Sequence, residues 1–421
     1  MKKMKAVLLG FGGRGAAYAR HAEQYPEELE IVAVAEPVEN RRATAKERLG
    51  LSDDQLYSDW REIAAQPKIA DFAIITTLEK LHCENALAMI EKGYDLLLEK
   101  PMAPTEEECK AITGAAEKKG VKVVICHVLR YAPFWIELKN AIDNGAVGKI
   151  ISAIHQENVG TELYSHAFVR GTWRTEELGA PMILAKCSHD VDLLQWLIGG
   201  KCKKVQSFGS LTHFTSDNRP LNAPLRCNDS CPVATECPYF VDRIYRNKNQ
   251  DNLHIWYRRC AANTVAPPTD EQVDAAMENG IYGRCVYACD NDVVDHQIVN
   301  MEFDDGCTAV LSMNGFNTPR RFLQIFGTKG ELIADAEDGT FRIYSFEKEA
   351  WTSYTPASGT EGHGGGDVYL MRELMRYFQD LPCGKSICDV RTSYENHMIA
   401  FAAEKSRHTG TVVDMDEFCK Y

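Results

Sequence analysis

Short apolar runs alternate with helical patterns over the first 126 residues. The runs cover residues 6–9, 31–35, 72–75, 95–98 and 121–126. Each run is too short for a helix and is apolar on both faces, which is typical of strands buried in a parallel sheet. Residues 83–91 carry apolar side chains at helical spacing, and Gly93 is suited to ending that helix. Residues 1–126 are therefore expected to form a doubly wound α/β domain.

The remaining residues, 127–421, combine a few helical patterns with strands of alternating polarity. A helix is expected up to about residue 144 and a strand over residues 150–156. Further alternating segments cover residues 295–303, 308–313, 322–326 and 331–334, separated by turns rich in Asp and Gly. This pattern predicts antiparallel strands in a second α/β domain.

Length and composition limit the class of protein. A chain of 421 residues is long enough for two domains. No apolar run approaches the roughly 20 residues of a membrane-spanning helix, and the lysine-rich start leads directly into a strand and not into a signal sequence. The net charge of -13 argues against nucleic acid or an anionic membrane as a partner. The fifteen cysteines are scattered, so a reducing, cytoplasmic location is expected.

A glycine-rich turn follows the first strand. Gly10, Gly12 and Gly15 fit the pattern G-x-G-x-x-G, and a helical pattern starts near Arg14. Glu36 ends the next strand, where a carboxylate accepts the ribose hydroxyls of NAD and repels a 2′-phosphate. The turn is therefore expected to bind NAD at the helix N-terminus. Arg41 and Arg42 lie nearby and leave NADP open, and a turn that binds nothing is the structural alternative.

A second chemical stretch follows the strand at residues 95–98. Glu99, Lys100 and Pro101 come directly after this strand, and ligands of open α/β sheets bind beyond the carboxyl ends of the strands. Lys100 is therefore expected beside a cofactor or substrate. An ordinary charged turn is the alternative.

A third stretch lies at residues 181–200. Lys186, His189 and Asp192 are three residues apart and would share one side of a continuous helix. Histidine is the usual base for an alcohol at neutral pH, and a neighbouring lysine would keep it neutral. His189 is thus a candidate general base, with a structural histidine as the alternative.

Two loop-like segments are candidates for contacts with a sugar or polyol, and the first combines aromatic rings with hydrogen-bond donors, which suits such a ligand. The first contains Tyr164, His166, Arg170, Trp173 and Arg174. In the second, glycines surround His363 and Asp367, and glycines allow a loop to approach a ligand closely. Ordinary surface loops remain the alternative in both cases.

Taken together, the glycine pattern, Thr76-Thr77, His82 and Glu99-Lys100-Pro101 resemble the Gfo/Idh/MocA family of glucose–fructose oxidoreductases and inositol dehydrogenases. The resemblance implies an N-terminal NAD(P)-binding Rossmann domain. It also implies a C-terminal α/β domain with a large, mostly antiparallel open sheet that forms homodimers or homotetramers. It further implies a cis bond before Pro101 and a Lys100 that touches both the nicotinamide and the reacting hydroxyl.

The resemblance also covers the segment around His189, which takes the place of the family's histidine. The family's aspartate, four residues upstream, is Ala185 in this chain. Asp190, Asp192 or Lys186 is expected to orient the histidine instead.

These observations predict two sets of contacts. The expected cofactor contacts are Gly10, Gly12, Gly13, Arg14, Gly15, Glu36, Arg41, Thr76, Thr77, His82, Glu99 and Lys100. The expected substrate contacts are Lys100, Tyr164, His166, Trp173, Arg174, Lys186, His189 and His363, with Lys100 and His189 catalytic. The expected reaction is NAD(P)-dependent oxidation of a secondary hydroxyl of a sugar, polyol or glycoside. The alternatives are a redox-assisted glycosidase without net NADH and a cofactor-binding regulator without catalysis.

Residues 213–297 exceed what the resemblance requires and are rich in cysteine. Cys227, Cys231 and Cys237 follow one another with spacings of four and six, Cys260 stands alone, and Cys285 precedes Cys289 by four residues. Cysteines a few residues apart hold zinc or iron–sulfur clusters, but these spacings match neither template well. Free cysteine is also common in protein cores. Whether Cys227, Cys231, Cys237 and Cys285 bind a metal is left open.

Overall fold

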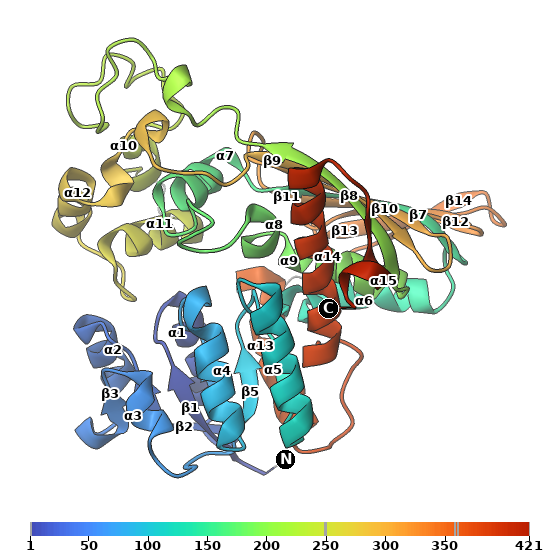
Figure 1. Ribbon diagram of the computed structural model, residues 1–421, viewed down its shortest axis with the longest axis horizontal. Helices are drawn as coiled ribbons and strands as arrows, with labels where there is room; N and C mark the ends of the chain where they lie inside the picture. The colour runs from blue at the N-terminus through green and yellow to red at the C-terminus, as the bar shows by residue number, and fades with distance from the viewer. Residues whose placement is uncertain (1, 248–250, 358, 360–361, 421) are drawn as a thin grey trace.

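The computed structural model describes residues 2–247, 251–357, 359 and 362–420. Its first sheet has six parallel strands in the order β3-β2-β1-β4-β5-β6 (Figure 1). They are β1 (Met4–Leu9), β2 (Leu29–Ala35), β3 (Leu56–Tyr57), β4 (Phe72–Ile75), β5 (Asp95–Leu98) and β6 (Val123–Ile125). All the expected strands are present, and the predicted parallel sheet is confirmed.

Helices cover both faces of this sheet. They are α1 (Gly13–Gln24), α2 (Glu39–Leu49), α3 (Trp60–Ala64), α4 (His82–Glu91) and α5 (Glu106–Lys119), with short 3₁₀ turns at Asp53–Gln55 and Glu79–Leu81. In β1, Val7 and Leu9 belong to one buried cluster, and Ala6 and Leu8 belong to another. Alternate side chains of a strand point to opposite faces, so both faces of the sheet are buried.

The second sheet has nine strands in the order β14-β13-β12-β11-β7-β10-β9-β8-β15. Only β7 and β10 pair in parallel, so the sheet is mostly antiparallel as expected. The strands are β7 (Ile150–Asn158), β8 (Cys202–Ser210), β9 (His296–Phe303), β10 (Thr308–Asn314), β11 (Arg320–Gly327), β12 (Gly330–Asp335), β13 (Thr340–Ser345), β14 (Ala350–Tyr354) and β15 (Val413–Asp414).

Further helical segments lie in the second part of the chain. They are η3 (Val128–Tyr131), α6 (Pro133–Asp143), α7 (Thr161–Tyr164), η4 (Ser165–Arg170), α8 (Met182–Ala185), α9 (Ser188–Ile198), η8 (Gly362–Gly365), α13 (Gly366–Phe378), α14 (Val390–Thr409) and α15 (Met415–Phe418). The long helix α14 packs against β8, α5 and α9 and so contacts both sheet domains (Figure 1).

Helix α13 lies late in the chain but packs on the first domain. Leu370 and Leu374 share a buried cluster with Leu8 of β1 and Phe72 of β4. Just after this helix, the backbone of Cys388 accepts a hydrogen bond from Ile125 of β6. The C-terminal part of the chain therefore completes the core of the N-terminal domain and brings the loop before α13 to the glycine-rich turn.

The cysteine-rich insertion has a small buried cluster of its own, and other residues of the insertion, such as Phe214 and Tyr287, belong to the main buried cluster. It contains η5 (Ser216–Asn218), α10 (Val241–Tyr245), α11 (Asn252–Ala262), α12 (Asp270–Asn279), η6 (Ile281–Gly283) and η7 (Val286–Ala288). In the view of Figure 1 its helices lie above α1 and α2, and Arg41 of α2 donates a hydrogen bond to Asn263 at the end of α11. The insertion thus reaches the edge of the predicted cofactor site.

Among the described residues, no helix is both long enough and apolar enough to span a membrane.

Candidate active site

The glycine-rich turn has the geometry of a dinucleotide site. Gly10 has φ +91°, and a Cβ on Gly15 would lie 2.2 Å from the carbonyl oxygen of Gly10, so neither position accepts a side chain. A Cβ on Gly13 would meet nothing within 4 Å, which leaves space beside the first turn of α1. Gly12 caps α1 without a side-chain hydrogen bond, so the first amides of the helix remain available to a phosphate. These features fit the pyrophosphate of NAD.

Glu36 lies at the end of β2, beside this turn. Its carboxylate accepts hydrogen bonds from the backbone N–H of Phe11 (2.7 Å) and of Val38 (2.9 Å). These bonds hold a negative charge where the ribose hydroxyls of NAD would bind. Arg42 donates hydrogen bonds to the carbonyl oxygens of Glu36 and Pro37. Arg41 lies over the turn, with its Nη1 3.6 Å from the position of a Cβ on Gly12.

Arg14 connects three parts of the chain at the start of α1. Its Nε lies 2.6 Å from Glu99, and its Nη2 lies 2.6 Å from Asp367 of α13. Tyr18 also donates a hydrogen bond to Glu99. Burial opposes the charge on Glu99 and Asp367, but the Arg14 guanidinium holds the pKa of both carboxyls below the usual range. Arg14 thereby fixes the strand end that carries Lys100.

Lys100 lies between the two domains. The peptide bond to Pro101 is cis, as the resemblance implied. The Lys100 ammonium donates a hydrogen bond of 2.8 Å to the backbone carbonyl of Ala185, the position where the family has an aspartate. Burial and the nearby Lys186 ammonium lower the pKa of Lys100, although Glu99 opposes the shift.

His189, near the start of α9, is buried, and its Nδ1 has no hydrogen-bond partner among the residues that the structure describes. Burial lowers the pKa of His189 well below its usual value, and the charges of Lys100 and His363 add to this effect. The ring centre of His363 lies 5.9 Å away, and His363 also approaches Arg14 at 3.4 Å. The geometry therefore brings Lys100, His189, His363 and Arg14 to one region.

The prediction of one continuous helical side at residues 186–192 is wrong. The helix is interrupted at Lys186 and Cys187, between α8 and α9, because the backbone of Cys187 leaves the helical region with φ -88° and ψ 4°. Lys186 instead pairs with Glu157 at 3.1 Å, and Asp192 forms a two-bond ion pair with Arg130.

The orienting group for His189 was expected to be Asp190, Asp192 or Lys186. Asp190 accepts hydrogen bonds from His155 and Arg321, both at 2.8 Å. Because Asp190 and Asp192 are committed to other partners, neither forms a hydrogen bond to His189 in the described structure.

The aromatic segment divides into two groups. Trp173 donates a 2.6 Å hydrogen bond to Glu79, which follows β4 in the first domain, so Trp173 lies where the domains meet. Arg174 pairs with Asp290 of the insertion at 2.7 Å. The segment therefore connects the insertion to the domain boundary.

Tyr164 and His166 lie elsewhere, in packed interiors. The Tyr164 hydroxyl donates to the backbone carbonyl of Val294, and its ring stacks on Phe214. His166 contacts Tyr245 and Tyr282 inside the insertion, and burial lowers the pKa of His166 to about 3. The structure does not bring these two residues to the Lys100 region, because their aromatic surface is used in packing.

The predicted residues after β4 support the turn around the candidate site. Thr76 donates a hydrogen bond to the carbonyl oxygen of Gly10, and Thr77 donates one to Asn85. The buried His82 ring lies between the carbonyl oxygens of Thr77 and Pro101, at 3.1 and 2.8 Å. His82 thereby joins the end of β4 to the cis-proline turn.

Sequence reasoning missed Glu157 and Arg321. Glu157 is 2% exposed and lies between Lys186 and Arg321, at 3.1 and 2.8 Å. The alternation of β7 contained a usable signal, because His155 and Glu157 occupy the same inward register as the buried Ala153. Buried charged residues at core-facing positions are typical of sites.

A Rossmann-type sheet with a glycine-rich turn, and a half-buried lysine near a buried imidazole, is typical of NAD-binding oxidoreductases. The chain belongs to the Gfo/Idh/MocA oxidoreductase family. Residues 4–127 match its NAD-binding Rossmann fold, and residues 139–415 match its C-terminal alpha/beta domain.

Individual relatives are distant. The Bacillus subtilis protein YteT is 23% identical over 325 residues, which are 72% of each chain. Inositol 2-dehydrogenase of Salmonella typhimurium is 25% identical over 206 residues, which are 49% of this chain and 57% of the relative. The structure of levoglucosan dehydrogenase in complex with NADH and levoglucosan superposes with a TM-score of 0.71 at 19% identity, covering 98% of this chain and 100% of that chain. At 19% identity, the similarity to levoglucosan dehydrogenase shows a shared fold.

Proposed function

We propose that this protein reversibly oxidises a secondary hydroxyl of a sugar, polyol or glycoside with NAD. The observation that carries the proposal is the convergence of the Lys100 ammonium and the unpaired, neutral His189 imidazole beyond the end of β5. An alcohol needs both a cation beside its oxygen and a base for its proton, and these two groups supply them.

The glycine-rich turn and Glu36 would hold NAD, which would supply the hydride acceptor, and the protein supplies position and charge. Lys100 donates a hydrogen bond to the reacting oxygen and stabilises its developing negative charge. His189 accepts the hydroxyl proton, because its lowered pKa keeps the imidazole unprotonated at neutral pH. Arg14 acts as a positioning residue, since its ion pairs with Glu99 and Asp367 hold the Lys100 turn against α13.

The polar surroundings support a polyhydroxylated substrate. His363 and Lys186 offer hydrogen-bonding groups near Lys100 and His189, and Trp173 offers an apolar face at the domain boundary. The related inositol dehydrogenases are named for such a substrate.

Self-association through the open sheet is part of the same proposal. Ile154, Phe208 and Ile298 are exposed and share one face of the sheet by register. Apolar side chains grouped in this way favour an interface.

The test is NADH absorbance with a panel of inositols, free sugars and aryl glycosides, each with NAD and separately with NADP. Net NADH from a polyol or sugar is expected, with NAD preferred because Glu36 faces the ribose position. Release of the aryl group without net NADH would instead establish a redox-assisted glycosidase. Tight NAD binding with no turnover of any compound would favour a regulator.

A further inference from the structure

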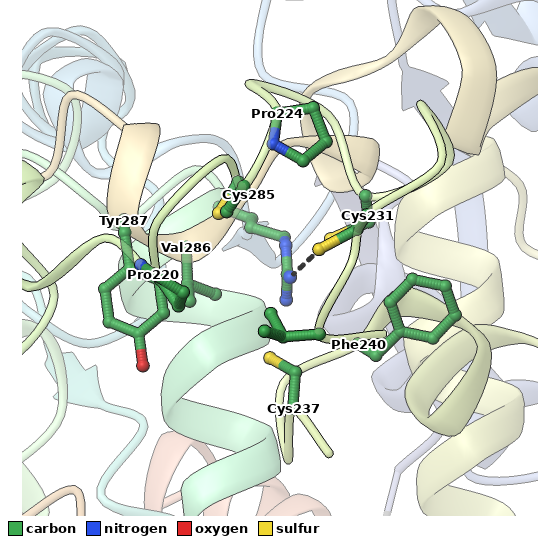
Figure 2. A pocket seen from close by; sticks show the side chains of 12 residues that line it. Pro220, Pro224, Cys231, Cys237, Phe240, Cys285, Val286 and Tyr287 are labelled. Atoms are coloured by element: carbon green, nitrogen blue, oxygen red, sulfur yellow. Dashed lines mark hydrogen bonds between the residues drawn. The ribbon is translucent and has the colours of Figure 1, made fainter. Parts of the chain in front are cut away.

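Four cysteines of the insertion line one small cavity that also contains Arg170. They are Cys227, Cys231, Cys237 and Cys285, and the remaining lining is largely apolar. Figure 2 shows Cys231, Cys237 and Cys285 arranged around this cavity. All four cysteines are free thiols. They come from two segments about fifty residues apart in the chain, so tertiary structure brings them together.

The first of these segments has almost no regular structure. Between the end of β8 at Ser210 and the start of α10 at Val241, the only helical element is the turn η5. A structureless stretch of this length is unusual in a compact domain and requires another source of order. The segment contacts its partner segment through two backbone hydrogen bonds, from Cys227 to Gly283 and from Cys285 to Leu225. These contacts place Cys227 and Cys285 opposite each other.

Arg170 carries a buried positive charge without an acidic partner. Its side chain is 0% exposed. Nε donates to the carbonyl oxygen of Arg284 at 2.7 Å, and Nη2 donates to that of Tyr239 at 2.8 Å and to the Cys227 sulfur at 3.6 Å. Nη1 has no hydrogen-bond partner, and among the described residues no carboxylate pairs with this guanidinium.

A buried, unpaired guanidinium is strongly unfavourable, because burial removes its hydration. Anionic sulfur next to Arg170 would supply the missing counter-charge and an acceptor for Nη1. Four neutral thiols supply no charge and only weak acceptors. Four thiolates without a metal would carry too much negative charge for an apolar cavity.

We propose that Cys227, Cys231, Cys237 and Cys285 bind one zinc ion as a tetrathiolate site, with Arg170 as its counter-cation. On binding, the four thiols release four protons, and four thiolates around a divalent ion leave two net negative charges. Arg170 offsets one of these and donates through Nη1 to a thiolate. No oxidant or reductant takes part.

The size of the cavity favours a single ion. Its volume is about 10 Å³, close to that of one water-sized sphere. Among the described residues, no three of the four cysteine sulfurs lie within 4.8 Å of one another. Zinc prefers four sulfur ligands in tetrahedral arrangement at about 2.3 Å, so the cysteine side chains have to rotate toward a common centre when the ion binds. An iron–sulfur cluster adds several further atoms and requires a larger space.

The site would have a structural role that extends to the domain boundary. Arg170 and Arg284 exchange hydrogen bonds with each other's backbone, and Asp290 pairs with both Arg284 and Arg174. Trp173, between Arg170 and Arg174, then contacts Glu79 of the first domain. A metal that orders the insertion would thus hold this segment beside the candidate active site.

The test is elemental analysis of the full-length protein purified without chelators. About one zinc per chain is expected, as for structural sites of this type. The variant Cys237→Ser should lose at least two thirds of this zinc. Cys260→Ser is the matched control, because Cys260 lies in α11 of the same insertion but does not line the cavity, and it should retain the full content.

A second measurement does not depend on the variants folding. Titration of the wild-type protein with an organomercurial, with a metal-sensitive dye present, should release zinc as the thiols react. Cobalt substituted for zinc should give the intense visible bands of tetrahedral thiolate coordination. Absence of stoichiometric metal, iron with sulfide in place of zinc, or full zinc content in Cys237→Ser would each overturn the proposal.

Discussion

The substitution Lys100→Met separates catalysis from cofactor binding. Methionine keeps an unbranched side chain of similar length and removes the charge and the donor. The Lys100 ammonium is half-buried, and among the described residues its hydrogen-bond acceptor is the Ala185 carbonyl oxygen at 2.8 Å. Its charge is therefore available to an oxygen that becomes negative during the reaction.

The size of the effect follows from this geometry. Loss of one preorganised donor to a developing oxyanion lowers turnover by about 10² to 10³. The carbonyl of Ala185 loses its partner, which costs about 1–3 kcal/mol of the free energy of unfolding. Removing a desolvated ammonium offsets part of that cost.

The assay compares three quantities in Lys100→Met and in wild-type protein. They are kcat with the substrate identified in the panel, the NAD dissociation constant by calorimetry, and the free energy of unfolding in urea. Lys110→Met is the control, because Lys110 is an exposed residue of α5. A fall in kcat with NAD affinity within about threefold, or less than 1 kcal/mol, is expected. Equal losses of kcat and NAD affinity would refute the catalytic role and make Lys100 structural.

Three further predictions concern charge and pH. Arg14→Gln should lower the free energy of unfolding by about 3 kcal/mol, because two buried carboxylates lose their partner. The control Arg61→Gln removes an exposed ion pair and should change the free energy of unfolding little. Equal effects of the two substitutions in urea titrations would contradict this account. The value of kcat/KM should stay high below pH 6.5, because burial and Lys100 lower the pKa of His189. It should fall at a lower alkaline pH than for an ordinary lysine, because the pKa of Lys100 is also lowered. An acid limb centred at or above pH 6.5 would argue against His189 as the base. Burial lowers the pKa of His127 to about 4 and those of His166 and His397 to about 3, so these rings stay neutral when folded and bind protons when unfolded. Their stabilising effect is complete above about pH 6.5 and is lost as the pH falls, by about 1 kcal/mol for each ring between pH 7 and 5.5; urea titrations at the two pH values should differ accordingly, and equal stability would refute the prediction.

The sequence by itself determined the strands of the first domain and the glycine-rich turn, because both depend on neighbouring residues in the chain. Apolar runs of four to six residues specify buried strands, so the sheet of the first domain was predictable from residues 6–9, 31–35, 72–75, 95–98 and 121–126. The glycine-rich turn was predictable for a similar reason, since Gly10 and Gly15 occupy positions where a Cβ collides with backbone. Glu99, Lys100 and Pro101 could be placed at a ligand-binding edge because they directly follow a strand.

Tertiary structure decided which of the candidate residues meet. Tyr164, His166 and Trp173 have similar local surroundings in the sequence. Of these three, Trp173 reaches the domain boundary, whereas the rings of Tyr164 and His166 are packed against residues of the second domain and the insertion. The break at Lys186 separates residues that a continuous helix would have aligned, and it exposes the Ala185 carbonyl to Lys100.

The same holds for contacts between distant segments. Helix α13 could be predicted from its apolar spacing. Its position against β1 and β4 could not, because it depends on contacts between segments some three hundred residues apart in the chain. The cysteines near residues 227–237 and 285 matched no spacing template, and only the fold places them around Arg170. Hydrophobic periodicity records which side of an element is buried, whereas the identity of the covering partner depends on the packing of the whole chain.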